Sequence, residues 1–368
     1  MGKSKSDDSN PVRGILHPEK PLDEDVRDTA LRPRSLDEFQ GQKKMTENLS
    51  VFIEAARERN ESLDHLFLIG PPGLGKTTLA QVVAHELKSD FKVTSAPALE
   101  KPKDLAGILT TLTEKTVFFI DEIHRLKPAI EEMLYIAMED YELDWIIGQG
   151  PGARTIRIPV QPFTLVGATT KAGNVSSPLI SRFGITCRFS FYEHADMEAI
   201  VRRSAGILGI VIQDDAAALL ARSARGTPRV VNRLLRRVRD FAQLRSGKDA
   251  VKTAGKTSVT REIVAESLDR LEIDSMGLEK YDREILKIII ERYNGGPVGA
   301  ETLAISIGES VDTLEDYYEP YLIQAGLIQR TPRGRTVTSY AYEYLKIPAQ
   351  KAFYQKEPGG LLFSPDEN

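Results

Sequence analysis

The chain has 368 residues, of which 41% are hydrophobic, and a formal net charge of −4. This length and apolar content favour two or three folded domains. The negative net charge excludes binding of nucleic acid through an overall positive field, so any nucleic-acid site has to be a local basic patch. Cys187 is the only cysteine, which excludes an intrachain disulfide and a cysteine metal cluster. The sequence has no run of 18 apolar residues and no apolar signal core, so we expect a cytosolic protein.

The first 26 residues are polar and charged and include few large apolar side chains. Such a composition predicts a disordered tail over residues 1–26. A helical pattern at 43–59 and an apolar run at 66–69 then predict an ordered domain over residues 27–196.

A glycine-rich loop follows the apolar run and has the sequence GPPGLGKTT at residues 70–78. It matches the P-loop pattern and lies between a strand-like segment and a helical one, which disfavours a chance glycine-rich turn. Glycines such as Gly73 and Gly75 let backbone N–H groups turn toward phosphate oxygens, and the following helix adds its positive N-terminus. We expect Lys76 to reach the β- and γ-phosphates of ATP and Thr77 to ligate Mg²⁺.

Two further buried strands are predicted, at residues 116–120 and 163–168. Asp121 and Glu122 follow the first of them, at the end of a strand where parallel sheets bind ligands. We expect Asp121 to hold the Mg²⁺ shell and Glu122 to polarise the attacking water, with a pair of exposed loop carboxylates as the alternative. Thr170 follows the second strand. Its hydroxyl either contacts the γ-phosphate or the attacking water, or merely satisfies backbone groups.

The region between these two strands predicts a helix at 128–139 and a β-hairpin. The hairpin has strand-like segments around 145–147 and 155–158, joined by a glycine-rich turn. Strands that alternate with helices predict an α/β fold with a parallel sheet flanked by helices.

Two arginines are candidates for contact with a transferred phosphoryl group. Arg182 follows a short helical stretch and is either a solvated surface residue or an arginine finger that neutralises developing charge. Arg229 follows Pro228 at the start of a later helix. It either points across a domain cleft at the phosphates or supplies surface charge, and the sequence leaves both open.

The pattern changes after residue 196. Helical periodicity dominates residues 197–275, and a Gly- and Lys-rich interruption at 245–258 is typical of a flexible loop. These residues predict a small, all-helical domain, with helices at 197–208, 214–224, 228–244 and 261–271.

Residues 276–346 predict a winged helix, because three helical patterns are followed by two short strands. The helices are expected at 281–293, 299–307 and 311–325, and the strands at 327–329 and 336–338. The wing contains Arg330, Arg333 and Arg335, and we expect this mobile basic hairpin to contact DNA phosphates independently of sequence. A plain solvated loop is the alternative. Residues 347–368 form a weakly patterned tail.

Together these motifs resemble the RuvB family, motors of the AAA+ class that drive branch migration of Holliday junctions. The resemblance runs from about residue 31 to residue 345 and rests on the order and spacing of all three units. It implies an AAA+ P-loop domain, a helical lid domain and a winged-helix domain. It also implies an ATP-driven hexamer that translocates duplex DNA in recombination and repair, together with RuvA and RuvC.

Two other classes stay open at this point. One is an AAA+ clamp-loader or origin-recognition-like ATPase, which uses nucleotide as a loading switch. The other is a winged-helix DNA binder with a degenerate nucleotide site. Four intact site residues argue against it: Lys76, Thr77, Asp121 and Glu122.

The resemblance also implies roles for single residues. The adenine end of the nucleotide would be held by Leu31, Arg32 and Tyr192. Thr170 and Arg229 match the two sensor positions, and Arg182 matches the finger that reaches a neighbouring subunit's nucleotide. Further nucleotide-site positions are Gly73, Lys76, Thr77, Thr78, Glu139, Asp140 and Tyr141. The hairpin would dock on RuvA through the apolar residues Ile146, Ile147 and Ile156, and Arg330 and Arg335 match DNA-contacting positions.

Overall fold

The computed structural model describes residues 30–147, 154–245 and 257–348. The chain divides into two compact units, residues 1–32 and 33–368. The predicted tail at 1–26 lies outside the described residues. Most of the predicted loop at 245–258 and most of the tail at 347–368 do so as well.

Residues 66–188 form a five-stranded sheet in the order β2-β3-β6-β1-β7, and all neighbouring strands are parallel. The strands are β1 (Leu66–Ile69), β2 (Phe91–Ser95), β3 (Val117–Asp121), β6 (Thr164–Thr169) and β7 (Ile185–Arg188). The three central strands are almost fully buried, which explains why their sequences are continuous apolar runs. β2 and β7 were not predicted, because they lie at the two edges of the sheet and include exposed residues, so neither is a continuous apolar run.

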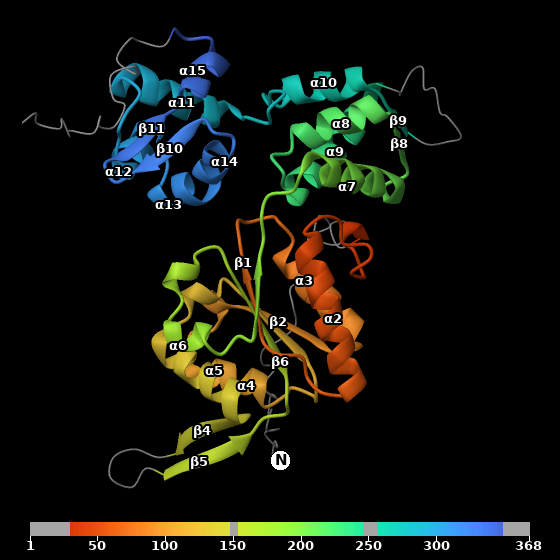
Figure 1. Cartoon of the computed structure of the whole chain (residues 1–368), viewed down its shortest axis with the longest axis vertical. Coiled ribbons are helices and arrows are strands. Elements are labelled where there is room, and N and C mark those ends of the chain that lie inside the picture. Colours follow the sequence, from red (N-terminus) through yellow and green to blue (C-terminus); the bar gives the residue numbers. More distant parts are fainter. Residues whose placement is uncertain (1–29, 148–153, 246–256, 349–368) are drawn as a thin grey trace, which may run out of the picture. The chain divides into compact units, whose positions relative to one another are not determined.

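Helices cover both faces of this sheet (Figure 1). One face packs on α2 (Lys43–Arg59) and α3 (Lys76–Leu87). The other packs on α4 (Pro102–Leu109), α5 (Pro128–Asp140) and α6 (Ser177–Ile180). Short 3₁₀ segments lie at Ala96–Ala98, Ile123–Arg125 and Ala172–Asn174. The predicted α/β architecture is confirmed.

The predicted hairpin is present as β4 (Glu142–Ile147) and β5 (Arg154–Pro159), which pair antiparallel with Trp145 opposite Ile156. It projects at the bottom of the sheet in Figure 1. Ile156 is 43% exposed. The side chains of Ile146 and Ile147 lie outside the described part of the structure.

The four predicted helices of residues 197–275 are present within a few residues of their expected ends. They are α7 (His194–Ile207), α8 (Asp214–Arg222), α9 (Pro228–Arg245) and α10 (Arg261–Arg270). The prediction of an all-helical domain is wrong, because β8 (Ile210–Ile212) and β9 (Thr257–Val259) form a parallel pair. Strands of three residues are too short to show an alternating pattern.

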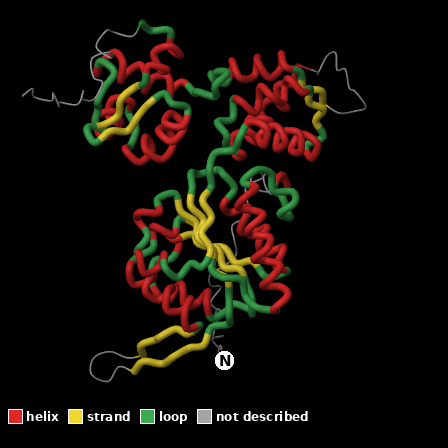
Figure 2. The backbone as a smooth tube through the Cα atoms, in the orientation of Figure 1, coloured by secondary structure: helices red, strands yellow, loops and turns green. Residues whose placement is uncertain are grey.

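The winged-helix region has its own apolar core. Its elements are α11 (Lys280–Tyr293), α12 (Ala300–Ile307), α13 (Val311–Thr313), a π-helical turn (Leu314–Tyr318), α14 (Glu319–Gln324), β10 (Ile328–Thr331), β11 (Gly334–Val337) and α15 (Ser339–Leu345). Figure 2 shows the two strands of the wing among the helices. The single helix predicted at 311–325 is interrupted, because Pro320 lacks the N–H that would bond one turn back. The wing strands are offset from their predicted positions, and α15 was not predicted.

Candidate nucleotide-binding site

The P-loop joins β1 to α3 at the carboxyl edge of the sheet. Gly73 and Gly75 have φ angles of +80° and +101°, which L side chains rarely adopt. A Cβ atom on Gly73 would lie 2.9 Å from Cγ2 of Thr227 and 3.2 Å from Cβ of Arg229. Position 73 therefore requires glycine for two reasons: its positive φ angle and the close approach of Thr227 and Arg229. The following helix begins at Lys76, so its unpaired N–H groups open into the loop.

Lys76 is buried, and its ammonium donates hydrogen bonds to the carbonyl oxygens of Gly70 (2.7 Å) and Pro71 (2.8 Å). Burial lowers the pKa of Lys76 to about 8. The positive charge of Arg229 adds to this lowering, while the carboxylates of Asp121 and Glu122 oppose it. The ammonium is thus held by neutral carbonyls beside two carboxylates, and an anion in the loop would stabilise its charged form.

The two acidic residues occupy the end of β3. One carboxylate oxygen of Asp121 accepts the N–H of Glu122 at 2.9 Å. Glu122 has a left-handed backbone, with φ 50°, and its exposed carboxylate pairs with Arg125 at 2.9 Å. Non-glycine residues in this conformation are strained, and such strain clusters at functional sites. Both acids thus lie at the carboxyl edge of the sheet, near the ammonium of Lys76.

The neighbouring strand β6 ends in a threonine pair. The hydroxyl of Thr169 bonds to Nδ1 of His124 (3.0 Å) and accepts the N–H of Lys171 (3.0 Å). Among the described residues, Thr170 forms no side-chain hydrogen bond, and it is half-buried. The hydroxyl that can still bind a ligand at this edge therefore belongs to Thr170, because the hydroxyl of Thr169 is already bonded to His124 and Lys171.

The lid reaches the P-loop through the start of α9. The backbone N–H of Arg229 donates to the carbonyl of Gly73 at 3.3 Å. Its side chain is exposed and forms no ion pair within the described ranges. Tyr192 lies between the two regions. Its hydroxyl donates to the carbonyl of Leu74 at 3.0 Å, and its N–H donates to the carbonyl of Gly226 at 2.9 Å. The structure thus brings Arg229 and Tyr192 to the P-loop.

Thr227 was not singled out from the sequence, although it packs against the P-loop at Gly73. The available signal was its position just before the Pro228–Arg229 pair. Thr77 and Thr78, in the first turn of α3, are half-buried. Leu31 and Arg32 belong to the N-terminal unit, residues 1–32, and their assignment to the adenine end stays a prediction.

Other predicted site residues lie at the opposite edge of the sheet. Glu139, Asp140 and Tyr141 end α5 or follow it. The preceding carbonyl of Met138 lies 3.1 Å from Nε2 of His65, the residue before β1. The ring of Tyr141 stands edge-on to that of Phe163, the residue before β6, with 6.1 Å between centroids. These contacts lie where the strands begin, whereas the P-loop lies where they end.

Arg182 belongs to the same amino edge, since it precedes β7. It donates to the carboxylate of Glu139 at 2.6 Å, and its guanidinium lies 4.6 Å from the ring centre of Tyr135. Its Nε is buried and has no hydrogen-bond partner among the described residues. β1, with four residues, separates the two edges by about 13 Å. Arg182 and Glu139 are therefore not brought together with the P-loop of their own chain.

The three wing arginines differ in environment. Arg330 is exposed and pairs with Glu315 at 3.0 Å. Arg333 is exposed at the turn and forms no ion pair in the described segments. Arg335, which was expected in a mobile basic hairpin, is buried and pairs with Glu315 (2.6 Å) and Glu319. The strand places Arg335 against two helix carboxylates, and its contact with DNA stays a prediction.

Three family models together match nearly all of the described chain. They are the Holliday junction DNA helicase RuvB P-loop domain (residues 31–189), the RuvB AAA lid domain (192–274) and the RuvB C-terminal winged helix domain (275–346).

Similar proteins cover the chain over most of its length. A Treponema denticola protein, named Holliday junction branch migration complex subunit RuvB, is 71% identical over 92% of this chain and 95% of its own. A Paramagnetospirillum magneticum protein of the same name is 55% identical over 88% and 90%. The solved Thermotoga maritima RuvB Holliday junction branch migration motor has a TM-score of 0.78 and 48% identity, over 87% of this chain and 100% of that one. The chain belongs to the RuvB family.

Proposed function

We propose that this protein is an ATP-driven motor that translocates duplex DNA and drives branch migration of Holliday junctions in recombination and repair. The observation that carries this proposal is the similarity over all three regions to relatives named for that activity. The Treponema denticola relative, for example, is 71% identical in sequence. We also propose the domain boundaries 27–196, 197–275 and 276–346. We propose, from the resemblance to the RuvB family, that the protein acts in the cytoplasm. No helix of the described residues is long and apolar enough to cross a membrane.

The nucleotide would bind between the P-loop and the lid. The N–H groups of Gly73, Gly75 and the start of α3 would surround the phosphates, and Lys76 would exchange its carbonyl partners for phosphate oxygens. Glu122 would orient and polarise the attacking water, with Thr170 as a second hydrogen-bond partner. Arg229 would contact the phosphates from the lid. The other proposed contacts of the nucleotide site are Leu31, Arg32, Thr78, Asp140, Tyr141 and Tyr192.

The donor set at the P-loop fits Mg²⁺. Within the described chain no group of three or more His, Cys, Asp or Glu side chains could hold a metal ion by itself. Thr77 and Asp121 instead supply one hydroxyl and one carboxylate, both hard oxygen donors. Mg²⁺ is usually bound by one or two carboxylates together with substrate phosphates and water. Mg²⁺ would neutralise charge on the β- and γ-phosphate oxygens.

We further propose that Arg182 completes the site of a neighbouring subunit. The separation of Arg182 from its own P-loop across the sheet supports this assignment, since the guanidinium cannot reach a nucleotide bound to the same chain. Glu139 would hold the guanidinium in place until a neighbour's triphosphate competes for it. A head-to-tail interface closes into a ring when the rotation from one subunit to the next closes, and we propose a hexameric ring.

The remaining proposals concern partners. Ile156 is an exposed apolar side chain on a projecting hairpin, and we propose that Ile146, Ile147 and Ile156 dock on RuvA, with RuvC as a further partner of the complex. Arg330 and Arg333 would contact DNA phosphates. We propose the same role for Arg335, which would exchange Glu315 and Glu319 for a DNA phosphate.

The test is a branch migration assay on a labelled four-way junction with the junction-binding partner present. The wild-type protein should separate the arms only with ATP and Mg²⁺. Glu122→Gln should bind ATP without separating them, because general base and water-orienting roles contribute about 10²–10⁴-fold to turnover. Wild-type ATP turnover without any arm separation would contradict the motor and favour a loading switch.

A further inference from the structure

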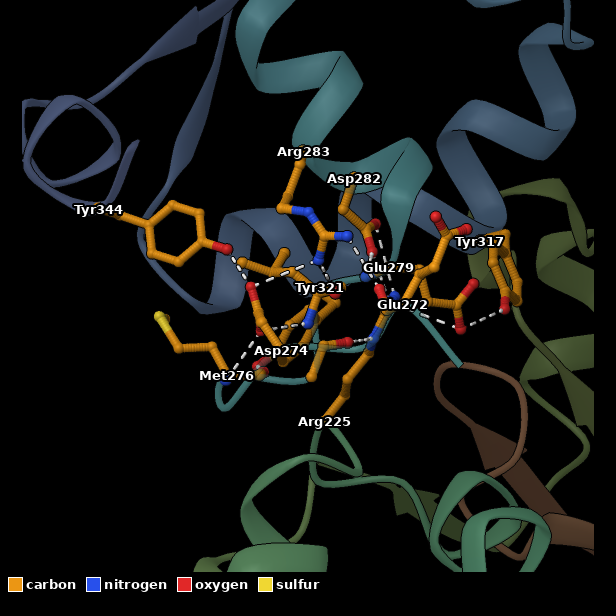
Figure 3. Close-up of polar contacts among 12 residues, drawn as sticks. Arg225, Glu272, Asp274, Met276, Glu279, Asp282, Arg283, Tyr317, Tyr321 and Tyr344 are labelled. Carbon is orange, nitrogen blue, oxygen red and sulfur yellow. Dashed lines mark hydrogen bonds and ion pairs between the residues drawn. The ribbon is translucent and has the colours of Figure 1, made fainter. Parts of the chain in front are cut away.

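The loop between α8 and α9 touches both neighbouring regions of the chain. On one side, the carbonyl of Gly226 accepts the N–H of Tyr192, and Thr227 packs on Gly73 of the P-loop. On the other side, the side chain of Arg225 enters the winged-helix region (Figure 3). Only three residues lie between Arg225 and Arg229, whose N–H bonds to the carbonyl of Gly73. The loop is therefore a short physical connection between the nucleotide site and the winged helix.

Arg225 is 7% exposed and uses its whole guanidinium. Its Nε donates to the carbonyl of Gly277 at 2.5 Å, and its terminal nitrogens bond to the carboxylate of Asp282. The guanidinium also lies 3.6 Å from Glu279 and 5.2 Å from the ring centre of Tyr321. Asp282, in the first turn of α11, is fully buried and also accepts the N–H of Glu279 at 2.7 Å. A lid side chain is thus the counter-ion of a carboxylate in the winged-helix core.

The segment that joins the two regions is itself tightly held. A Cβ atom on Gly277 would lie 2.5 Å from the carbonyl oxygen of Ser223, so lid and connection are in direct backbone contact. Asp274 accepts the N–H groups of Met276 and Leu278, each at 2.9 Å. Tyr344 of α15 bonds to Asp274 as well (Figure 3). This connection is fastened at both ends and has little freedom to act as a hinge.

A buried ion pair is a poor source of stability, because desolvation of both charges offsets their attraction. It does fix one arrangement strongly, since any movement that separates the partners leaves an unpaired charge in an apolar environment. The bidentate contact with Asp282, the bond to Gly277 and the stacking on Tyr321 also set the angle of the guanidinium plane. These contacts resist rotation between the lid and the winged helix.

We propose that Arg225 is a positioning residue that makes the lid and the winged helix one rigid lever. A nucleotide-dependent shift of the P-loop against Thr227 and Arg229 then moves the wing by the same rotation. This inference rests on the proposed motor function and assigns a specific residue to its coupling step. It requires that Arg225 act on DNA movement without taking part in ATP cleavage.

The test uses a double variant, Arg225→Met with Asp282→Asn, which removes both charges and keeps an acceptor for the N–H of Glu279. The matched control is Arg270→Met. Arg270 also pairs with a carboxylate, Glu266 at 2.9 Å, and stacks on a ring, Phe241 at 5.6 Å, but all three lie within the lid. Thermal unfolding of each variant shows whether it is folded at the assay temperature.

The first readout is coupling. In the double variant, ATP turnover without DNA and duplex binding should stay within about twofold of wild type, while branch migration per ATP falls by about tenfold, in the range of coupling between sites. The control variant should keep wild-type ATP turnover, duplex binding and branch migration per ATP. Unchanged branch migration per ATP in the double variant would overturn the proposal, and so would a parallel loss of turnover and migration in a folded protein.

The second readout is rigidity and does not depend on motor activity. Dyes on Leu244→Cys in the lid and Ile305→Cys in the winged helix, in a Cys187→Ala background, report the distance between the two regions by single-molecule energy transfer. Both positions are exposed, at 83% and 79%. In the wild type, the distribution of distances should be narrow and should have the same mean with ATP analogue, with ADP and without nucleotide. In the double variant, this distribution should broaden. A wild-type distance that changes with nucleotide would overturn the lever. Absent branch migration with a constant distance would instead overturn the motor function alone.

Discussion

The two edges of the parallel sheet differ in how far their charged and polar side chains are already paired. At the carboxyl edge, Lys76, Asp121 and Thr170 present donors and acceptors that are only partly used inside the protein. At the amino edge, Arg182 is already paired with Glu139. An open P-loop site and a paired arginine lie on one chain, separated by the length of β1. This separation supports the proposal that each subunit gives one half of a site and receives the other.

The largest effect that would sharpen this comparison is expected from Arg182→Ala. Loss of the finger should lower ATP turnover by about 10³-fold or more, while ATP binding stays nearly unchanged because the P-loop edge is intact. The measurement is steady-state ATP hydrolysis together with binding of a fluorescent ATP analogue. Arg59→Ala serves as the control, because Arg59 is an exposed arginine paired with Glu61 at 2.8 Å outside the proposed site, and turnover should persist. Survival of full turnover in Arg182→Ala would show that the amino edge has no catalytic part.

The carboxyl edge should respond to pH through Lys76, whose pKa is lowered to about 8. The triphosphate favours the ammonium form, which is present before binding below pH 8 and has to be formed by proton uptake above it. ATP affinity should therefore be constant between pH 6.5 and 7.5 and weaken by about tenfold between pH 7 and pH 9. Titration calorimetry at several pH values measures this. Lys76→Met should bind weakly at every pH, and an equal slope in that variant would assign the effect to another group.

A smaller effect is expected at the contact between the lid and the P-loop. Gly73→Ala should lower the free energy of unfolding by about 1 kcal/mol, because its φ is positive, and the contact with Thr227 should add to this loss. Gly107→Ala is the matched control. Gly107 lies in helix α4, and a Cβ there would meet nothing within 4 Å, so that variant should be more stable by about 1 kcal/mol. Denaturant unfolding compares the two. A loss of only about 1 kcal/mol in Gly73→Ala, as its φ alone predicts, would mean that the lid does not press on the P-loop.

The sequence could predict the carboxyl edge because its signals are local. The P-loop, Asp121 and Glu122 each follow a continuous apolar strand, and burial on both faces makes such strands recognisable. The positions of Arg182 and Glu139 could not be predicted in this way. They come together from segments 43 residues apart, and only the order of the strands puts both at the amino edge.

Elements with weak patterns were missed for related reasons. The edge strands β2 and β7 are partly exposed, so they lack an apolar run, and β8 and β9 have three residues each. In the sequence, Arg335 looks like any solvated arginine of a wing. Its burial depends on Glu315 in the π-helical turn and Glu319 in α14. The pairing of Arg225 with Asp282 could not be predicted for the same reason, because the two residues are 57 positions apart in the sequence.

The most direct test of the shared site is to mix two inactive variants. Lys76→Ala lacks a working P-loop and Arg182→Ala lacks the finger, so neither should hydrolyse ATP alone. In an equal mixture that forms random rings, about a quarter of the interfaces pair an intact P-loop with an intact finger, and a corresponding share of wild-type turnover should return. Arg182→Ala mixed with the double variant Lys76→Ala, Arg182→Ala should stay inactive. A mixture of the single variants that also stays inactive, or full turnover by a monomeric wild-type protein, would contradict the account.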